Sequence, residues 1–592
     1  MSDEGPAPKH RAPGPPMTSD PGDPNDATMI MRPIEAELPA PPGAPPTTTS
    51  SLLSASALMA AGTVVSRLTG FVRAGLIVSA LGISLNADVF NNSNTIPNAL
   101  YILVAGGIFN VVLVPQLIRA MKNDEDGGDA YANRVITLGL MVLLVATIVL
   151  VIAVPVFVRL IFDGGLFDPS NDAPRESAYA LMRYCMPQVF FYGAFVLVGQ
   201  ILNARGRFGP MMWAPIVNNV VSCGVLVTYI AVYGTSNGSD GFSRGEELLL
   251  GWGSTVGIAL QVAVLVPYLR KAGFSFRPRF DFRGVGLGHT LRLGMWTLFF
   301  IVANQISFFV INRIGSGASV EAALAPGTQE AAGSTVYQFA FLISQVPHGI
   351  ITVSIVTATM PLLSRLAADR AYGDMRGQLS SSLRLVLAAI VPLAVAVACL
   401  GQSIATMMTS YGELKGNTEV IGYTIMAFAP AMVLFTVHYM MLRGFYANED
   451  TRTPFLVQIW LSATNIVLAI LLTALVRPGL VSTMLALAYG GAYLVGSILS
   501  TTMLTRQIGT IFDARTWKYL ARLIVACAFA AAAMLGASAG LGMAGFEVAR
   551  LSGALVIALA AGTLGAVAYL LAARLLRISE VTSLVGAVLR RG

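Results

Sequence analysis

The chain has 592 residues, of which 55% are hydrophobic and 12% are charged, and its mean hydropathy is +0.69. Soluble globular proteins carry about 25% charged residues, so this composition excludes that class. Repeated apolar runs of about 18 or more residues indicate a polytopic α-helical membrane protein. The formal net charge of +7 does not indicate nucleic-acid binding, because lysine and arginine gather in short loops between the apolar runs.

Residues 1–50 differ in kind from the rest of the chain. They are rich in Pro, Asp, Ser and Thr and contain no long apolar run, which predicts a disordered cytoplasmic tail. The pattern of a secretory signal is absent. The Pro-rich stretch 33–46 is interpreted as a spacer, with a docking peptide as the alternative.

Hydropathy predicts an all-α fold with fourteen membrane-spanning helices. The predicted spans are residues 52–80, 89–118, 134–161, 178–203, 211–234, 247–269, 290–312, 334–362, 382–408, 420–442, 454–476, 480–504, 518–541 and 550–573. Basic residues fall mainly in alternate loops, and the positive-inside rule then places both termini in the cytoplasm. Four arginines in these loops are interpreted as anchors at the inner membrane surface rather than ligands: Arg205, Arg207, Arg443 and Arg452.

Two halves of the chain share features at a nearly constant offset. Pro115 recurs as Pro361, Pro210 as Pro454 and Asn218 as Asn465, which are offsets of 246, 244 and 247 residues. Parallel repeats of this kind are typical of transporters, with a substrate site between the halves. The predicted division is a tail at 1–50, six-helix halves at 51–272 and 285–508, two additional helices at 515–577 and a short cytoplasmic tail at 578–592.

The first predicted span carries two arginines at membrane depth, Arg67 and Arg73. Arginine in this position costs roughly 2.5–3.5 kcal/mol on insertion scales, so it usually faces a bundle interior or a wet cavity. Six positions are roughly 600° of helix, about 120° off one face, so both residues can border a wide cavity but not a narrow seam. Fixed positive charge in an apolar protein predicts an anionic ligand. The alternatives are pairing with a neighbouring helix or snorkelling to an interface.

Several stretches of the chain resemble one known family. These are TVVSRLTGFVR at 63–73, Asp88, IPN at 96–98, LVPQL at 113–117, LNAR at 202–205, APIVNN at 214–219 and RGFYANEDTRTP at 443–454. They are similar to the MurJ/MviN lipid II flippases, which belong to a superfamily with multidrug exporters and polysaccharide-precursor flippases. The resemblance runs from about residue 52 onward and implies fourteen spans.

The resemblance implies export of lipid II, an undecaprenyl-diphosphate-linked disaccharide-pentapeptide, to the outer leaflet of the bacterial cytoplasmic membrane. It further implies that Ser66, Arg67 and Arg73 bind the substrate and that Asp88 acts at a gate. The chain departs from many members at four positions, where a basic or acidic residue is replaced: Tyr101, Ile102, Gly106 and Leu342. We therefore expect this chain to bind the diphosphate with fewer charged side chains than those members use.

Each remaining candidate has a plainer interpretation beside the functional one. Asp88 is equally well a helix N-cap. Pro97, Asn98, Gly106 and Gly107 are expected to form a hinge in the second span, although Pro and Gly occur routinely in membrane helices. Asn218 and Asn465 are ion-site candidates, with interhelical hydrogen bonding as the more common role. The lone imidazoles His348 and His438 are candidates for a proton relay, with a structural role in apolar surroundings as the more common one.

No cofactor or metal site is expected, because the chain lacks a phosphate-binding loop, a His/Cys cluster and a nucleophile–base pair; its four cysteines are far apart. We therefore predict a transporter and not an enzyme, working by alternating access and driven by membrane potential or a monovalent ion. Expected partners are lipid II, membrane lipids and, through the tail, cell-wall synthesis or division proteins, but no nucleic acid. The alternatives are a flippase for another lipid-linked oligosaccharide, a multidrug antiporter, or a membrane scaffold.

Overall fold

The computed structural model describes residues 49–102, 126, 128–205, 207, 209–235, 237–281, 287–324, 333–409 and 418–583. Within these ranges every regular element is helical. Twelve helices or helix pairs are long and apolar enough to cross a membrane. The all-α polytopic fold is therefore confirmed. The count of fourteen stays a prediction, because the second predicted span, 89–118, lies partly outside the described residues, as do the tails at 1–48 and 584–592.

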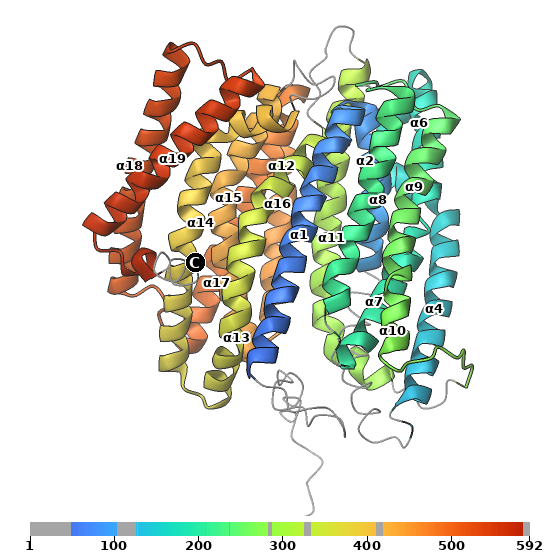
Figure 1. The fold of residues 1–592 in the computed structure, drawn as a ribbon, viewed down its shortest axis with the longest axis horizontal. Coiled ribbons are helices and arrows are strands. Elements are labelled where there is room, and N and C mark those ends of the chain that lie inside the picture. The colour runs from blue at the N-terminus through green and yellow to red at the C-terminus, as the bar shows by residue number, and fades with distance from the viewer. Residues whose placement is uncertain are drawn as a thin grey trace, which may run out of the picture.

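An N-terminal group of helices occupies one side of the molecule (Figure 1). Its members are α1 (Thr49–Leu81), α2 (Leu85–Tyr101), α4 (Asp129–Ile152), α5 (Val154–Ile161), α6 (Asp172–Cys185), α7 (Gln188–Ala204), α8 (Gly209–Tyr233), α9 (Arg244–Ala263) and α10 (Leu265–Lys271), with short 3₁₀ turns η2 (Gly164–Phe167) and η3 (Pro169–Asn171). Within this group α1 packs along α8.

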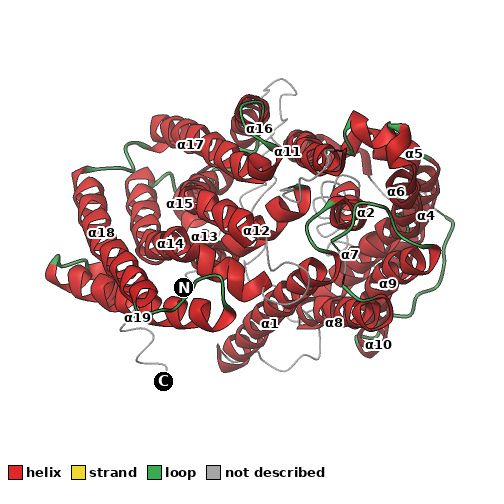
Figure 2. Cartoon of the chain, turned by 90° about the horizontal axis from the view of Figure 1, so that it is seen from above, coloured by secondary structure: helices red, strands yellow, loops and turns green. Residues whose placement is uncertain are grey.

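A C-terminal group lies beside it. Its members are α11 (Leu287–Leu324), α12 (Ser334–Pro347), the π-helical turn η4 (His348–Thr352), α13 (Val353–Ala368), α14 (Tyr372–Thr409), α15 (Thr418–Ala447), α16 (Arg452–Thr473), the 3₁₀ turn η5 (Pro478–Leu480) and α17 (Val481–Ile508). The hairpin α18 (Ala514–Met543) and α19 (Leu551–Leu575) packs on α14 at the far edge. Seen from above, α1, α2, α11 and α12 lie between the two groups (Figure 2).

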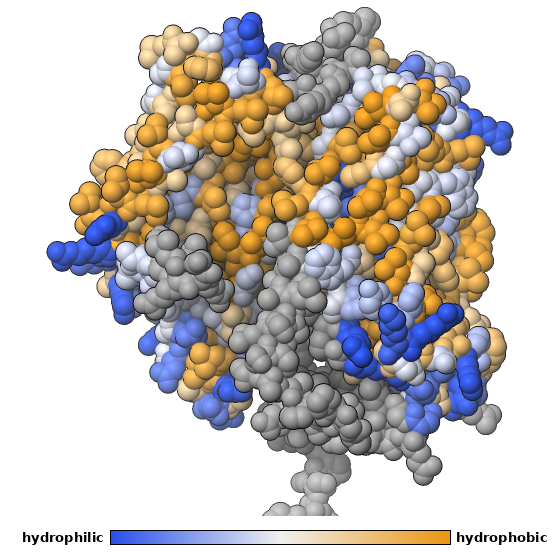
Figure 3. All heavy atoms as spheres, in the orientation of Figure 1, coloured by the Kyte–Doolittle hydropathy of each residue, from blue (hydrophilic) through white to orange (hydrophobic). Residues whose placement is uncertain are grey.

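Apolar side chains cover the flanks of the molecule. Figure 3 shows a broad hydrophobic surface with hydrophilic residues gathered toward the lower end. Large exposed apolar residues occur on α4, α8, α16, α18 and α19; examples are Val145, Val227, Trp460, Phe529 and Leu559. Such exposure would be unfavourable in water, and it fits helices that face lipid.

The helices of the two groups pack in matching ways. α1 packs on α8 in the N-terminal group, and α11 packs on α16 in the C-terminal group. At the contact between groups, α2 packs against α12. The backbone N–H of Ser334 donates to Asp88 across a separation of 246 residues, and Gln338 donates to Asn92 across the same separation. Residues that contact their own repeat partner lie at the axis relating the repeats, so the offset found in the sequence reappears as a packing relation.

Candidate functional site

Arg67 reaches from α1 toward the C-terminal group. Its nearest described neighbour there is Gly349 in η4: a Cβ atom on Gly349 would lie 2.6 Å from Cζ of Arg67. The residue before η4 is Pro347, which has no N–H to donate, and proline commonly marks such irregular turns. The Arg67 side chain is exposed within the protein and has no ion-pair partner among the described residues. This guanidinium is available to a ligand.

Arg443 on α15 lies close to the same place. Its Cζ stacks 4.0 Å from the ring centroid of Tyr439 and 5.5 Å from that of Tyr446, and its Nε is buried without a hydrogen-bond partner. His348 contacts the Tyr439 ring at 4.8 Å and lies within electrostatic range of both Arg67 and Arg443. Arg443 therefore packs on aromatic side chains of its own helix, and its role as an anchor at the inner membrane surface stays a prediction.

Arg67 and Arg443 form what we call the cationic cluster. The two guanidiniums belong to opposite groups, and neither is paired with a carboxylate in the described part of the chain. They suit a doubly charged phosphate ligand, because the planar guanidinium of arginine matches the geometry of phosphate oxygens. The sequence signal for Arg443 was present: it follows a long apolar run in α15. It was missed because a helix-end arginine is ordinarily interfacial.

Arg73 has different neighbours from Arg67. It lines a small cavity between α1, α2, α8 and α9 together with Asn94, Ser222 and Ser254. The cavity offers about 10 Å³ for the centre of a water-sized sphere, which is the size of one water. The Nε of Arg73 is buried and has no hydrogen-bond partner within the protein. Arg73 thus faces the interior of the N-terminal group, as its 120° offset from Arg67 requires.

Ser66 takes part in a contact between α1 and α8. The Nδ2 of Asn219 donates to the Ser66 carbonyl at 2.9 Å and to Oγ1 of Thr69 at 3.0 Å. In the C-terminal group Asn465 makes the matching contact, donating to Oγ of Ser307 at 3.1 Å. Asn219 and Asn465 are 246 residues apart (465 − 219), so Asn219 rather than Asn218 has the repeat position. The two adjacent asparagines left the sequence alignment ambiguous by one residue.

Asn218 and Asn465 contact different helices. Oδ1 of Asn218 accepts from Ser222 at 3.4 Å within α8, whereas Asn465 contacts α11. Oδ1 of Asn465 is buried without a partner. No group of three or more His, Cys, Asp or Glu side chains converges among the described residues. Asn465 therefore makes an interhelical hydrogen bond, whereas the hydrogen bond of Asn218 stays within its own helix, and an ion site at either residue stays a prediction.

Asp88 joins the two groups of helices at one end of the molecule. Its carboxylate is fully buried and accepts from Oγ of Ser319 at 2.8 Å, from the N–H of Ser334 at 3.0 Å and from the N–H of Thr335 at 2.7 Å. The last two are free N–H groups in the first turn of α12, so Asp88 caps that helix from another element. The capping role is thus observed, on α12 and not on Asp88's own helix, while the gate stays a prediction.

A polar seam continues from Asp88 along α2 and α12. Gln338 is its centre: Oε1 accepts from Asn91 at 3.1 Å, and Nε2 donates to Asn312 at 2.7 Å. Asn92 donates to Oγ of Ser334 at 3.1 Å. Hydrogen bonds shielded from water join the groups here, next to an apolar cluster that contains Val78 and Ile83 of the N-terminal group and Val336 of α12.

The expected hinge lies just below this seam. Pro97 is buried inside α2, Asn98 is half-buried, and Nε2 of Gln305 donates to the Ala99 carbonyl at 2.8 Å. Gly106 and Gly107 lie outside the described residues. Of the positions that depart from the family pattern, Tyr101 stacks on Tyr192 with ring centroids 5.5 Å apart, Ile102 is exposed, and Leu342 is half-buried on α12.

The chain matches known proteins over most of its length. The family model described as lipid II flippase MurJ matches residues 77–551. The chain belongs to the lipid II flippase MurJ family. A probable lipid II flippase MurJ of Haemophilus influenzae is 27% identical over 405 residues, covering 66% of this chain and 75% of that protein. Another, of Rhizobium meliloti, is 26% identical over 490 residues, covering 82% and 86%.

Solved structures share the fold of this MurJ-family chain. A lipid II flippase MurJ in an inward closed conformation superposes with a TM-score of 0.66 at 19% identity, covering 88% of this chain and 98% of that one. An inward-facing multidrug resistance transporter of the MATE family and MOP superfamily gives 0.57 at 15% identity, covering 74% and 95%. By its family the chain is a multi-pass membrane transporter and not an enzyme, and the family predicted from its motifs is confirmed.

Proposed function

We propose that this protein is a lipid II flippase that moves undecaprenyl-diphosphate-linked peptidoglycan precursor from the inner to the outer leaflet of the bacterial cytoplasmic membrane. The observation that carries the proposal is the cationic cluster: Arg67 of the N-terminal group and Arg443 of the C-terminal group both lie within electrostatic range of His348, and neither has a paired carboxylate among the described residues. A diphosphate cannot enter hydrocarbon unaided, because burying its charge costs many kcal/mol. Two guanidiniums in a wet cavity replace part of its hydration.

Alternating access supplies the movement in this proposal. The hydrogen bonds between the groups run from Asp88, at the end of the molecule where α1 finishes, through the polar seam to Gln305, near the other end of α2. Both termini are cytoplasmic in our proposal, which makes the end where α1 finishes the outer one. This arrangement supports a cycle in which the transporter loads lipid II from the inside. Separation of α2 from α12 then releases the headgroup outside, while the lipid tail stays in the bilayer.

A cationic-drug antiporter would need carboxylates facing its cavity. The two charged residues within electrostatic range of His348 are arginines, so an anionic cargo fits better. We further propose that the tail at 1–50 contacts cell-wall synthesis or division proteins. Coupling to a monovalent ion remains the alternative to the membrane potential as the driving force, and no cofactor is proposed.

The leaflet distribution of lipid II tests the function. Cells depleted of this protein are complemented with the native gene, Arg67→Ala, Arg443→Ala or the control Arg452→Ala, whose side chain is exposed and stacks on Trp296 at 5.6 Å. Outer-leaflet lipid II is scored by a cleaving enzyme that cannot enter the cell. We expect the native gene and Arg452→Ala to restore export. Each cluster variant should lower export tenfold or more, because a hydrogen bond to a charged group contributes roughly 1.5–3 kcal/mol. Unchanged export under depletion would refute the proposal.

A further inference from the structure

A second cationic site lies far from the cluster, where the hairpin α18–α19 meets α14. A cavity there is lined by five basic side chains, Arg384, Arg515, Lys518, Arg522 and Arg577, and by one carboxylate, Glu580. It offers about 90 Å³ for the centres of water-sized spheres, room for several waters or a phosphate group. None of these residues takes part in the cationic cluster or the polar seam.

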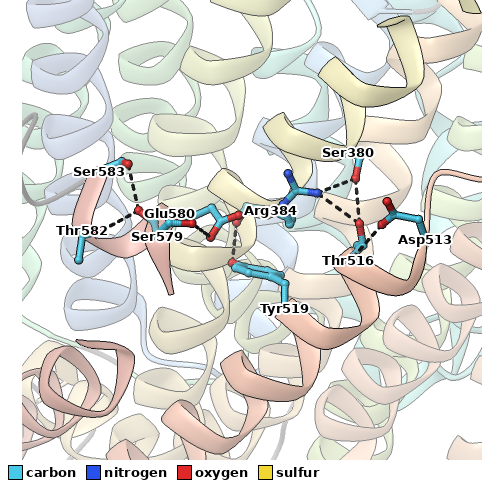
Figure 4. Close-up of polar contacts among 9 residues, drawn as sticks. All are labelled: Ser380, Arg384, Asp513, Thr516, Tyr519, Ser579, Glu580, Thr582 and Ser583. Carbon is cyan, nitrogen blue, oxygen red and sulfur yellow. Dashed lines mark hydrogen bonds and ion pairs between the residues drawn. The ribbon is translucent and has the colours of Figure 1, made fainter. Parts of the chain in front are cut away.

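Arg384 forms the floor of this site. It is 7% exposed, and it donates from Nε to Glu580 at 2.9 Å and from Nη1 to Ser380 at 3.0 Å and Thr516 at 3.3 Å. The phenol of Tyr519 donates to the Arg384 carbonyl at 2.6 Å. Figure 4 shows these contacts fixing the guanidinium between α14 and α18. A buried arginine held by four partners is built into the fold, unlike a flexible surface charge.

The charge of the site is strongly positive. Five basic groups and one carboxylate leave +4, and Asp513 beside them reduces it to +3. Asp513 caps α18 by accepting from the Thr516 N–H at 2.8 Å. The hydrogen bonds from Thr516 are the main cause that lowers the pKa of Asp513, and the charges of Arg384 and Arg515 lower this pKa further. Both carboxylates are therefore already engaged within the protein. The basic groups at the rim, Arg515, Lys518 and Arg577, are exposed and have no ion-pair partner among the described residues.

The surface beside the site has the composition of a membrane interface. The hairpin ends part-way along α14 (Figure 1); Arg384 is 12 residues after Tyr372, roughly 18 Å along the helix axis. Trp517, 61% exposed, stands beside Lys518, and tryptophan is enriched at membrane interfaces. Immediately along the hairpin, the surface is apolar, with Ile524 64%, Leu571 58% and Leu575 82% exposed. Figure 3 shows this change from hydrophilic to hydrophobic surface at the lower end of the hairpin.

We propose that this cavity binds an anionic phospholipid: its phosphate occupies the space among Arg384, Arg515, Lys518 and Arg577, and its acyl chains lie along the exposed face of α18 and α19. Basic pockets between membrane helices recognise lipid headgroups in this way. Glu580 partly neutralises Arg384 and competes with the phosphate. The bound lipid would tie the hairpin to α14, on the C-terminal group.

Lipid-dependent thermal stability of the full-length protein in detergent tests the proposal. The additions are phosphatidylglycerol, phosphatidylcholine and inorganic phosphate, each titrated against the native protein, Arg515→Gln/Lys518→Gln and the matched control Arg506→Gln/Arg574→Gln. The control removes two exposed basic residues that do not line the cavity. We expect phosphatidylglycerol alone to raise the melting temperature, with about thirtyfold weaker binding in the cavity variant and unchanged binding in the control, since each basic residue contributes about fivefold.

Glu580→Gln is expected to strengthen phosphatidylglycerol binding, whereas the cavity variant weakens it. Removing the competing carboxylate should lower the melting temperature without lipid, because Arg384 loses its partner, and should make the rise with phosphatidylglycerol larger. Equal stabilisation by phosphatidylcholine, or native-like phosphatidylglycerol binding by the cavity variant, overturns the proposal. An equal rise with inorganic phosphate shows a free-anion site and also overturns it. Lipid II export is measured separately, so either result stands apart from the proposed function.

Discussion

Single residues decide whether the cationic cluster has the right geometry. Gly349 is the clearest case, because its lack of a side chain leaves the space that the Arg67 guanidinium occupies. Arg443 is held differently, by the faces of Tyr439 and Tyr446, which attract its positive charge while leaving its edge free for a ligand. Arg67 is thus placed by the space beside a glycine, and Arg443 by stacking on two tyrosine rings.

Replacing Gly349 with alanine should impair export without unfolding the protein. The added methyl group would lie 2.6 Å from Cζ of Arg67, and the flexible arginine would move away. A displacement of about 1 Å at a binding group can lower activity by up to a hundredfold, and we expect a loss of about tenfold in lipid II export. Gly373→Ala is the control, since nothing lies within 4 Å of its Cβ. Native export by Gly349→Ala would argue against a role for Arg67 in its observed position.

Asp88→Asn should loosen the gate. Three donors point at the carboxylate, and an amide in its place loses the charge that the first turn of α12 favours. We expect the outward-open population to rise tenfold or more, because bonds to charged groups contribute roughly 1.5–3 kcal/mol each. The measurement is labelling of Gln338→Cys by an impermeant maleimide added outside the cell.

The control for this gate is Asp163→Asn. That carboxylate accepts from the Gly165 N–H at 3.0 Å within η2 and does not take part in the polar seam. It should leave the labelling rate of Gln338→Cys unchanged. A labelling rate that is the same for Asp88→Asn and the native side chain would show that Asp88 only caps α12.

At the scale of elements, α2 and α12 are the pair that must separate. Their contact is made of hydrogen bonds between side chains such as Asn92 and Gln338, and both helices are interrupted near their ends by proline. The contacts of α1 with α8 and of α11 with α16 stay within one group each. The elements therefore divide into contacts that hold a group together and contacts that join the groups.

Cross-linking α2 to α12 should stop transport. Asn92→Cys with Ser334→Cys replaces a pair whose side chains are 3.1 Å apart, and a short bifunctional thiol reagent would join the groups. We expect export to fall to the level of depleted cells and to recover after reduction. Thr69→Cys with Asn219→Cys, a pair 3.0 Å apart within the N-terminal group, should cross-link without loss of export. Continued export with the first pair fully joined would contradict separation of α2 from α12.

At the scale of the whole molecule, the charge of the cargo sets the direction of a potential-driven step. An inside-negative potential favours outward movement of a negative diphosphate by about 2.3 kcal/mol per charge for each 100 mV. We therefore expect export to fall when the potential is clamped to zero with the cation gradients kept. Export that is insensitive to the potential but follows a monovalent cation gradient would assign the driving force to that ion.

The sequence by itself determined the membrane class, most of the helix bounds and the family. Predicted spans such as 420–442 and 518–541 lie within α15 and α18, because long apolar runs leave a helix as the way to satisfy the backbone in lipid. The repeat offset of about 246 was also readable, since proline and asparagine recur at matching places. The arginines of the first span were recognised because charge at membrane depth is costly.

Only the tertiary structure decided which of these residues meet. Arg443 and Arg67 both lie within electrostatic range of His348, and Arg73 parts from Arg67 because their directions differ around α1. Asp88 caps α12 because that helix begins beside it. The basic cavity at α14, α18 and α19 draws its residues from segments almost 200 positions apart. Hydropathy and spacing report the environment of each helix, whereas partners across helices depend on rotation and packing.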